Sequence, residues 1–155
     1  MSYDNPFRRE VYVFANTTFG SATESQKIIG PKGKKGLVRE IFTHVTADMV
    51  GTTTVPEIDV GATSGSFEYA RHRLGTTAIL GNTLAGSPYR ASALAAGSGG
   101  SFTGGVPPTL NDYAGHVALE TARIPADTAF FITRTAGVGG TPAGFGVTEV
   151  TIDWD

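Results

Sequence analysis

The stretch IIGPKGKKGLVREIF, at residues 28–42, combines glycine, proline and lysine in a way that suits either a phosphate-binding loop or a turn between two strands. A Walker loop has a glycine, four further residues and then Gly-Lys followed by Ser or Thr, because the lysine contacts the terminal phosphates and the hydroxyl holds magnesium. Here Gly33-Lys34 is followed by Lys35, and Ile28 stands where the first glycine should be. No helical pattern follows that would direct backbone amides at a phosphate. We therefore expect no phosphate site in this stretch.

The same residues are typical of a turn. Gly30-Pro31 and Lys32-Gly33 are turn-forming dipeptides, and Gly36 ends the turn before an apolar run. A turn at this place leaves the lysine side chains able to reach solvent or a binding partner. We therefore interpret the segment as a connection between two strands that displays lysines.

The residues that usually carry catalysis or bind metals are present at unsuitable spacings. His44, His72 and His116 are separated by 28 and 44 residues, which matches none of the short histidine spacings of zinc sites. Ser64 lies in GATSGS, where Gly61 is one residue too far away for a nucleophile elbow. The sequence therefore predicts no catalytic residue, no metal site and no cofactor.

Acidic residues leave one enzyme class open. Glu57 and Asp59 form the only closely spaced acidic pair before Asp153 and Asp155 at the end of the sequence. Calcium-binding loops need more closely spaced acids, so this pair does not predict a calcium site. The paired carboxylates of glycoside hydrolases, however, meet in space and leave no spacing in the sequence. An enzyme therefore remains an alternative for which no residues can be named, although we expect a protein without catalytic activity.

The elements that would position these residues are predicted to be strands. Glycine, threonine and alanine dominate, strong helix formers are sparse, and short apolar runs are separated by turn residues. With seven or eight strand candidates and no βαβ rhythm, we expect an all-β fold: an antiparallel two-sheet sandwich, jelly-roll-like, with at most one short helix. The segment Glu68–Leu74 also suits a helical turn. The expected strands are Arg8–Ala15, Lys27–Ile29, Leu37–Ala47, Val55–Val60, Glu68–Leu74, Val117–Ala122, Ala129–Thr135 and Val147–Trp154.

The one expected helix begins at Ser87, a capping residue, and at Pro88, which suits the first helical position; Gly97 follows its end. Residues 97–108 contain five glycines and two prolines, so we expect an exposed loop or a segment that orders against a neighbouring subunit. The chain then divides into an N-terminal arm at residues 1–8 and a single sandwich domain at 9–155.

Alternation along the strands predicts which side chains face the core. The last strand alternates apolar and polar residues, which places Trp154 in the core and argues against its stacking on a sugar ring. The first strand carries Val11 and Val13 on one face and Tyr12 and Phe14 on the other. A strand with two apolar faces is covered on both sides, by a second layer or by another subunit. This pattern predicts that the monomer is not the final state.

Composition and charge limit the class of protein further. The 155 residues fit one domain, and the absence of cysteine excludes disulfides and thiolate chemistry. Residues 1–40 carry a net charge of +3 and the remaining 115 residues a net charge of −5. This basic excess is small for nucleic-acid binding, and we recognise neither a secretory signal nor an apolar span of roughly 20 residues. We expect a protein made in the cytoplasm, with no nucleic-acid or membrane partner.

Three stretches carry a resemblance: IIGPKGKKGLVREIFTHVTADMVGTTTVPEIDVGA, then FEYARHRLGTTA, then IPADTAFFITRTAGVGGTPAGFGVTEVTIDW. In their order of strand, glycine-rich turn and strand they resemble the small jelly-roll virion proteins of tailed bacteriophages, especially head decoration or cement proteins. The resemblance covers residues 9–155 and includes no catalytic motif. It implies a noncatalytic protein on the outer capsid surface, commonly a trimer, that bridges capsomers against the pressure of the packaged DNA.

We therefore expect a capsid decoration protein of the virion whose partners are the major capsid protein and further copies of itself. Aromatic and arginine side chains are enriched at binding hot spots, and lysines at a turn can reach an acidic partner. The alternative is a carbohydrate-binding or receptor-binding jelly-roll module of a phage tail or fibre. The residues expected to contact the capsid or another subunit are Phe7, Arg8, Arg9, Lys32, Lys34 and Lys35.

Overall fold

A computed structural model gives the fold for residues 8–20, 23–50, 53–54, 56–74, 88–92, 123–139 and 141–155. These residues form eight strands and no helix. The strands are β1 (Arg8–Thr18), β2 (Glu24–Ile29), β3 (Gly36–Val50), β4 (Glu57–Gly61), β5 (Ala70–Arg73), β6 (Pro88–Ser92), β7 (Ala129–Thr135) and β8 (Ala143–Trp154).

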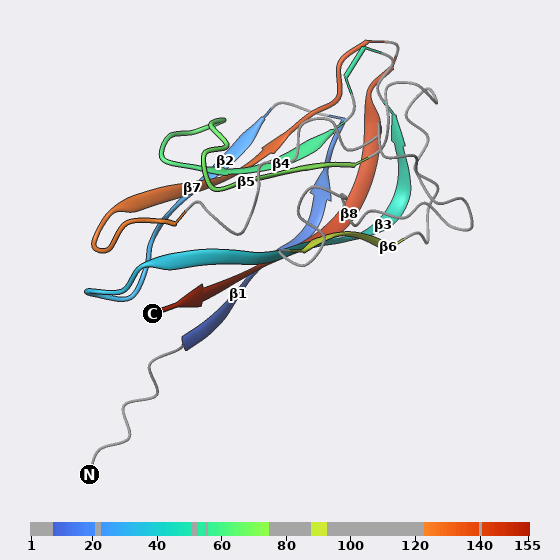
Figure 1. The fold of residues 1–155 in the computed structure, drawn as a ribbon. Coiled ribbons are helices and arrows are strands. Elements are labelled where there is room, and N and C mark those ends of the chain that lie inside the picture. The colour runs from blue at the N-terminus through green and yellow to red at the C-terminus, as the bar shows by residue number, and fades with distance from the viewer. Residues whose placement is uncertain are drawn as a thin grey trace.

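The strands form two antiparallel sheets that face each other as two layers (Figure 1). One sheet has the order β1-β8-β3-β6 and the other the order β2-β7-β4-β5. The pairing is nested along the chain, because β1 pairs with β8, β2 with β7, β3 with β6 and β4 with β5. The expected all-β, antiparallel two-sheet sandwich is therefore confirmed.

Alternating side chains of both sheets meet in one core, as the sequence predicts for β8. In β8 the burial alternates along its length, and Trp154 at its end is 1% exposed. Its ring lies 5.8 Å from the ring of Phe130 in the opposite sheet, measured between centroids. Trp154 is thus a core residue, and a sugar cannot stack on it in this fold. The core side chains from β3, β4, β7 and β8 are Val38, Ile41, Val45, Met49, Ile58, Val60, Phe130, Ile132, Val150, Ile152 and Trp154.

The side chains of β3 do not alternate regularly at its start. Strict alternation would place Val38 and Ile41 on opposite faces, yet both are completely buried in the core. The register of β3 against β8 shifts between Val38 and Glu40. Such an irregularity inserts an extra residue into one strand and reverses the inside-outside parity beyond it. The shift lets a fifteen-residue strand present apolar side chains to the core on both sides of it.

The prediction that β1 is covered on both faces is also wrong within this chain. Tyr12 and Phe14 pack against the core, as expected. Val11 and Val13 on the other face are 50% and 56% exposed. A cover over these two valines from another subunit stays a prediction.

The expected helix after Ser87 is replaced by a strand over the residues that the structure describes. Pro88–Ser92 forms β6, which pairs with β3 from Glu40 to His44. Local capping signals favoured a helix, whereas the free edge of β3 supplies backbone hydrogen-bond partners that only a strand can use. Three other expectations lie outside the described residues: Phe7, the glycine-rich loop at 97–108 and the strand at Val117–Ala122.

Candidate docking surface

The turn predicted between two strands connects β2 to β3 and is fixed by hydrogen bonds. The amide of Lys34 donates to the carbonyl of Pro31 at 3.1 Å, which closes the turn. Gly33 has a φ of 71°, a left-handed conformation that glycine adopts without strain. Its amide also donates to the Asp127 carboxylate at 2.9 Å, so a second turn, just before β7, holds the lysine turn in place.

The base of this turn is anchored to Trp154. Gly30 and Gly36, on either side of the turn, lie so close to the Trp154 ring that a side chain at either position would overlap it. Lys35 and Asp155 exchange backbone hydrogen bonds of 2.9 and 3.0 Å, which continue the pairing of β3 with β8 by one residue. The lysine side chains are therefore carried by a well-supported turn between the two sheets rather than by a loose loop.

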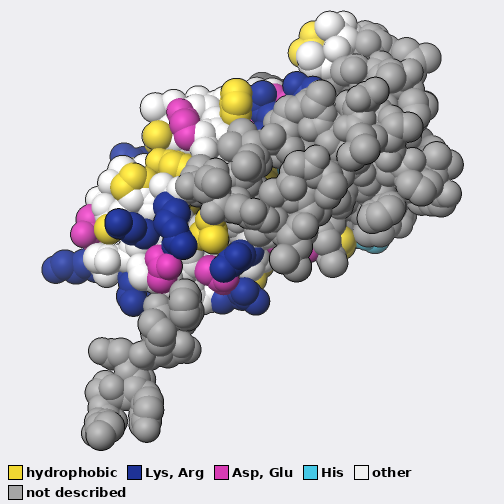
Figure 2. Space-filling view, in the orientation of Figure 1, with side chains coloured by type: hydrophobic (Ala, Val, Ile, Leu, Met, Phe, Trp, Pro, Cys, Tyr) yellow, Lys and Arg dark blue, Asp and Glu magenta, His cyan; other side chains and the backbone are white. Residues whose placement is uncertain are grey.

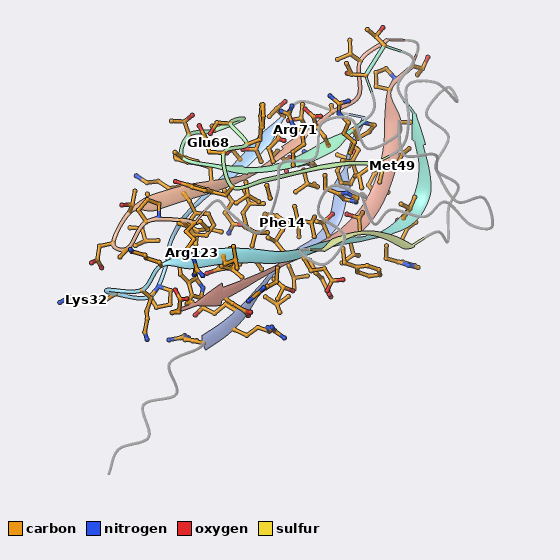
Figure 3. The ribbon with its side chains drawn as sticks, in the orientation of Figure 1. Phe14, Lys32, Met49, Glu68, Arg71 and Arg123 are labelled. Atoms are coloured by element: carbon orange, nitrogen blue, oxygen red, sulfur yellow. The ribbon has the colours of Figure 1, made fainter. Side chains whose placement is uncertain are left out.

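The structure brings five of the six expected contact residues to one end of the molecule. Arg8 lies opposite Trp154 in the register of β1 with β8, and Lys35 lies beside Asp155. Figure 3 shows Lys32 projecting from the tip of the turn and Arg123 nearby. Figure 2 shows Lys and Arg side chains gathered around this end, with acidic side chains between them. We call this group the basic end: Arg8, Arg9, Lys32, Lys34, Lys35, Arg39 and Arg123.

The arginines of the basic end are organised around two acids near the C-terminal end of β8. Asp153 accepts hydrogen bonds from Arg9 at 2.7 Å and from Arg39 at 2.8 Å. The hydrogen bond from Arg9 lowers the pKa of the Asp153 carboxyl below its ordinary value, partial burial opposes this, and Arg39 lowers it further. Arg123 similarly binds the Asp155 carboxylate at 2.7 Å. These pairs fix the arginine side chains in position.

An apolar patch lies beside the basic end on the outer face of the same sheet. In the β1–β8 register, Arg9 is opposite Asp153 and Val11 is opposite Thr151, two residues further along. The exposed Val11 and Val13, which we call the valine patch, thus continue the face that carries Arg9. An apolar centre with a charged border is the usual composition of a protein-binding surface.

Sequence reasoning missed Arg39 and Arg123 as members of this surface. Arg39 is 114 residues from Asp153 and Arg123 is 32 residues from Asp155, so the pairs are visible only after the strands are assembled. The one available signal was the closely spaced Asp153 and Asp155 at the end of the last strand, which provide acceptors for basic side chains from neighbouring strands.

The acidic pair Glu57 and Asp59 is engaged by arginine rather than presented to a pocket. Arg71 binds Asp59 with two hydrogen bonds, the shorter 2.7 Å, and lies 3.3 Å from Glu57. Asp59 is 1% exposed, and this burial raises the pKa of its carboxyl, while the hydrogen bond from Arg71 lowers it. Phe67 stacks on the Arg71 guanidinium at 3.5 Å from the ring centroid.

The positions of the histidines do not indicate a particular chemistry. His44 is exposed on β3 and His72 is buried in the core, while His116 lies outside the described residues. Within the described ranges, no three His, Cys, Asp or Glu side chains are grouped so as to hold a metal ion. In the same part of the chain, no helix has the length and apolar character needed to cross a membrane.

No protein-family model matches this sequence, and neither a curated protein nor a solved structure matches it. The fold and the surfaces described above are therefore the basis for any statement about function.

Proposed function

We propose that this chain is a noncatalytic structural protein of a bacteriophage virion, which binds the outer surface of the capsid and stabilises the head. The observation that carries this proposal is the valine patch bordered by the basic end on a rigid sandwich. The partner is the major capsid protein, and the decoration protein acts on the capsid surface as a homotrimer.

The strand order supports a jelly roll as the finer description of the sandwich. A jelly roll is a long antiparallel double strand rolled into two sheets, so its first strand pairs with its last, its second with its next-to-last, and so on inward. The four nested pairs of this chain follow that rule. Jelly rolls occur in capsid proteins and in lectins, so the fold alone does not choose between these functions.

The charges and the apolar patch have separate roles in the proposed binding. Lys32 and Lys35 extend from the turn between β2 and β3 and attract acidic side chains on the capsid, which accelerates encounter and orients the molecule. Val11 and Val13 then lose their contact with water in the centre of the interface. Because a capsid repeats the same site many times, a trimer can contact several sites at once and bind more tightly than one subunit.

The proposal is tested with capsids purified without this protein. The wild-type chain should bind them saturably in co-sedimentation and should raise the temperature at which they release DNA. The double variant Lys32→Glu/Lys35→Glu should bind about tenfold more weakly, because it places acids against acids. Lys27→Glu is the matched control, since Lys27 is exposed on β2 in the opposite sheet and should leave binding unchanged. A folded wild-type protein that does not bind capsids would refute the proposal.

A second candidate function is carbohydrate or receptor binding, and Phe67 favours it. This aromatic side chain is 42% exposed and lies over Arg71, close to two carboxylates. Aromatic rings next to polar groups are suited to binding sugar rings. Retention on a glycan array that is lost in Phe67→Ala, together with absence of capsid binding, would favour this function over decoration.

A further inference from the structure

An arginine lies on the core face of β7, where an apolar residue would be expected. Side chains of this strand alternate, with Phe130, Ile132 and Arg134 facing inward and each of them almost completely buried. The Arg134 side chain is 4% exposed, and its guanidinium forms an ion pair of 3.0 Å with the carboxylate of Glu24 on β2. The Glu24 side chain is 71% exposed. The buried cation is therefore paired with an acid that stands mostly in water.

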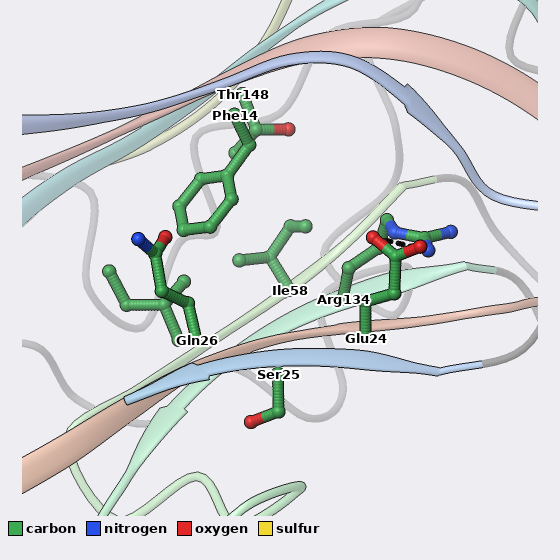
Figure 4. A pocket seen from close by; sticks show the side chains of 8 residues that line it. Phe14, Glu24, Ser25, Gln26, Ile58, Arg134 and Thr148 are labelled. Carbon is green, nitrogen blue, oxygen red and sulfur yellow. Dashed lines mark ion pairs between the residues drawn. The ribbon is translucent and has the colours of Figure 1, made fainter. Parts of the chain in front are cut away.

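A cavity of about 190 Å³ opens beside this ion pair, between the two sheets. Figure 4 shows Phe14 and Thr148 on one side of it and Gln26, Ile58, Arg134 and Glu24 on the other. Its lining residues are Phe14, Glu24, Ser25, Gln26, Ile58, Ile132, Arg134 and Thr148. The three lining residues from β2 are exposed, so the cavity is accessible to solvent along that edge of the sandwich.

The lining is divided into an apolar and a charged part. Phe14, Ile58 and Ile132 contribute apolar side chains from both sheets. Arg134 and Glu24 form the charged end (Figure 4). A small-molecule site typically has this composition, with mostly apolar walls and a few polar groups that orient the ligand.

Stability alone does not account for an arginine in this position. Replacing a buried ion pair with apolar side chains of similar volume is often neutral or stabilising, because the charges no longer have to be removed from water. A leucine or methionine at 134 would extend the apolar wall formed by Ile58 and Ile132. The buried cation is therefore better explained by binding than by folding.

We propose that this cavity binds a small monocarboxylate with an apolar body, such as one aromatic ring or a short alkyl chain. The carboxylate of the ligand takes the place of Glu24 on Arg134, and its body contacts Phe14, Ile58 and Ile132. Since Glu24 is mostly exposed, its carboxylate can turn into solvent without breaking the core. This site lies between the sheets and is independent of the proposed capsid-binding surface.

Charge and volume define the ligand class. The guanidinium fork matches a carboxylate with two parallel hydrogen bonds, and a carboxylate already occupies that place in the structure. A protein cavity of about 150 Å³ can hold benzene, whereas drug-sized ligands take roughly 300–1,000 Å³. A volume of about 190 Å³ therefore fits one ring with a carboxylate but excludes larger molecules such as nucleotides.

The test is a titration of the whole protein with benzoate at neutral pH, followed by NMR of the isoleucine methyl groups. Benzoate should shift the methyl signals of Ile58 and Ile132 saturably, with a Kd of about 1 mM, as expected for so few atoms. Benzyl alcohol, which has the same ring without the charge, should bind at least about tenfold more weakly. Glu24→Gln should tighten benzoate binding, because it removes the competing carboxylate while keeping the shape of the side chain.

Two arginine variants complete the experiment. Arg134→Met replaces the charged guanidinium with an apolar side chain of similar length. The protein should therefore fold, and it should lose the preference for benzoate over benzyl alcohol. Arg39→Met, on the outer face, should bind benzoate as the wild type does. The proposal is overturned if folded wild type and Glu24→Gln show no saturable shifts up to about 10 mM benzoate. It is equally overturned if Arg134→Met binds benzoate as tightly as the wild type does and keeps the preference over benzyl alcohol.

Discussion

At the scale of single residues, Asp59 and Arg71 show how a strand can carry acids on its outer face and still bury one of them. Both project from the outer face of the second sheet, and Asp59 becomes buried beneath Arg71, which in turn is covered by Phe67. The cover that removes Asp59 from water comes from residues on β5 and on the loop before it.

Removing Arg71 takes away the principal cation of Asp59 and part of the cover over this carboxylate. We expect Arg71→Ala to lower the free energy of unfolding by about 3 kcal/mol, since breaking a buried ion pair strands the remaining charge. Arg73→Ala is the matched control: Arg73 is 36% exposed and pairs with Glu57 at 3.4 Å, so its loss should amount to less than about 1 kcal/mol. Urea denaturation of the two variants measures the difference, and equal losses would contradict the role given to Arg71.

The ionisation of Asp153 predicts how the stability of the fold depends on pH. Its hydrogen bond from Arg9 lowers the pKa of the folded carboxyl, so its ionised form stabilises the fold at a pH above the ordinary Asp value of about 3.9. This contribution is lost as the pH falls through the lowered pKa of the folded state. We therefore expect Asp153→Asn to be less stable than the wild type at pH 7 and to equal it in strong acid.

Thermal unfolding between about pH 2 and pH 7 measures this dependence. Glu149→Gln is the control, because Glu149 is an exposed acid on the same strand. A stability difference for Asp153→Asn that stays constant across the whole range would show that the carboxylate charge is not responsible.

At the scale of elements, the turn that connects β2 to β3 across the two sheets depends on Gly30, Gly36 and Trp154. Gly36→Ala places a methyl carbon 2.6 Å from the Trp154 ring, which must move although it is fully packed. We expect a loss of about 1–3 kcal/mol, the usual effect of overpacking a core.

Gly33→Asn is the matched control for this turn. Gly33 has open space around it, and asparagine tolerates its positive φ better than other side chains, so the loss should be below about 1 kcal/mol. Thermal unfolding of both variants checks the prediction. A larger effect at Gly33 than at Gly36 would mean that backbone conformation, rather than contact with Trp154, maintains the turn.

At the scale of the whole molecule, the uneven charge distribution predicts salt-dependent binding. All four lysines precede residue 36, and three of them lie in the turn between β2 and β3 at the basic end. If these lysines attract an acidic capsid surface, raising NaCl from about 50 to about 500 mM should weaken binding several-fold, because the screening length shortens below about 10 Å. Lys32→Glu/Lys35→Glu should remove most of this dependence, and an unchanged salt profile in that variant would place the charged contact elsewhere.

The proposed trimer is a second property of the whole molecule. Light scattering at micromolar concentration should give three times the protomer mass of 16.1 kDa. A measured mass equal to one protomer would show that the homotrimer does not form in solution. The trimer could then assemble only on the capsid.

The sequence by itself determined the all-β class, seven of the eight strands and the inward face of β8. These features follow from alternation and turn chemistry, which act between residues close in the chain. It also identified the lysine turn and the burial of Trp154.

Only the tertiary structure decided the features that depend on partners far along the chain. The edge of β3 made a strand of Pro88–Ser92 against its local helix signals, and the register shift in β3 turned Val38 inward. The pairing of Arg39 with Asp153 and the cavity beside Arg134 likewise require strands that are distant in sequence to become neighbours. Local patterns cannot encode these outcomes, because backbone pairing and side-chain burial are set by whichever strand lies opposite.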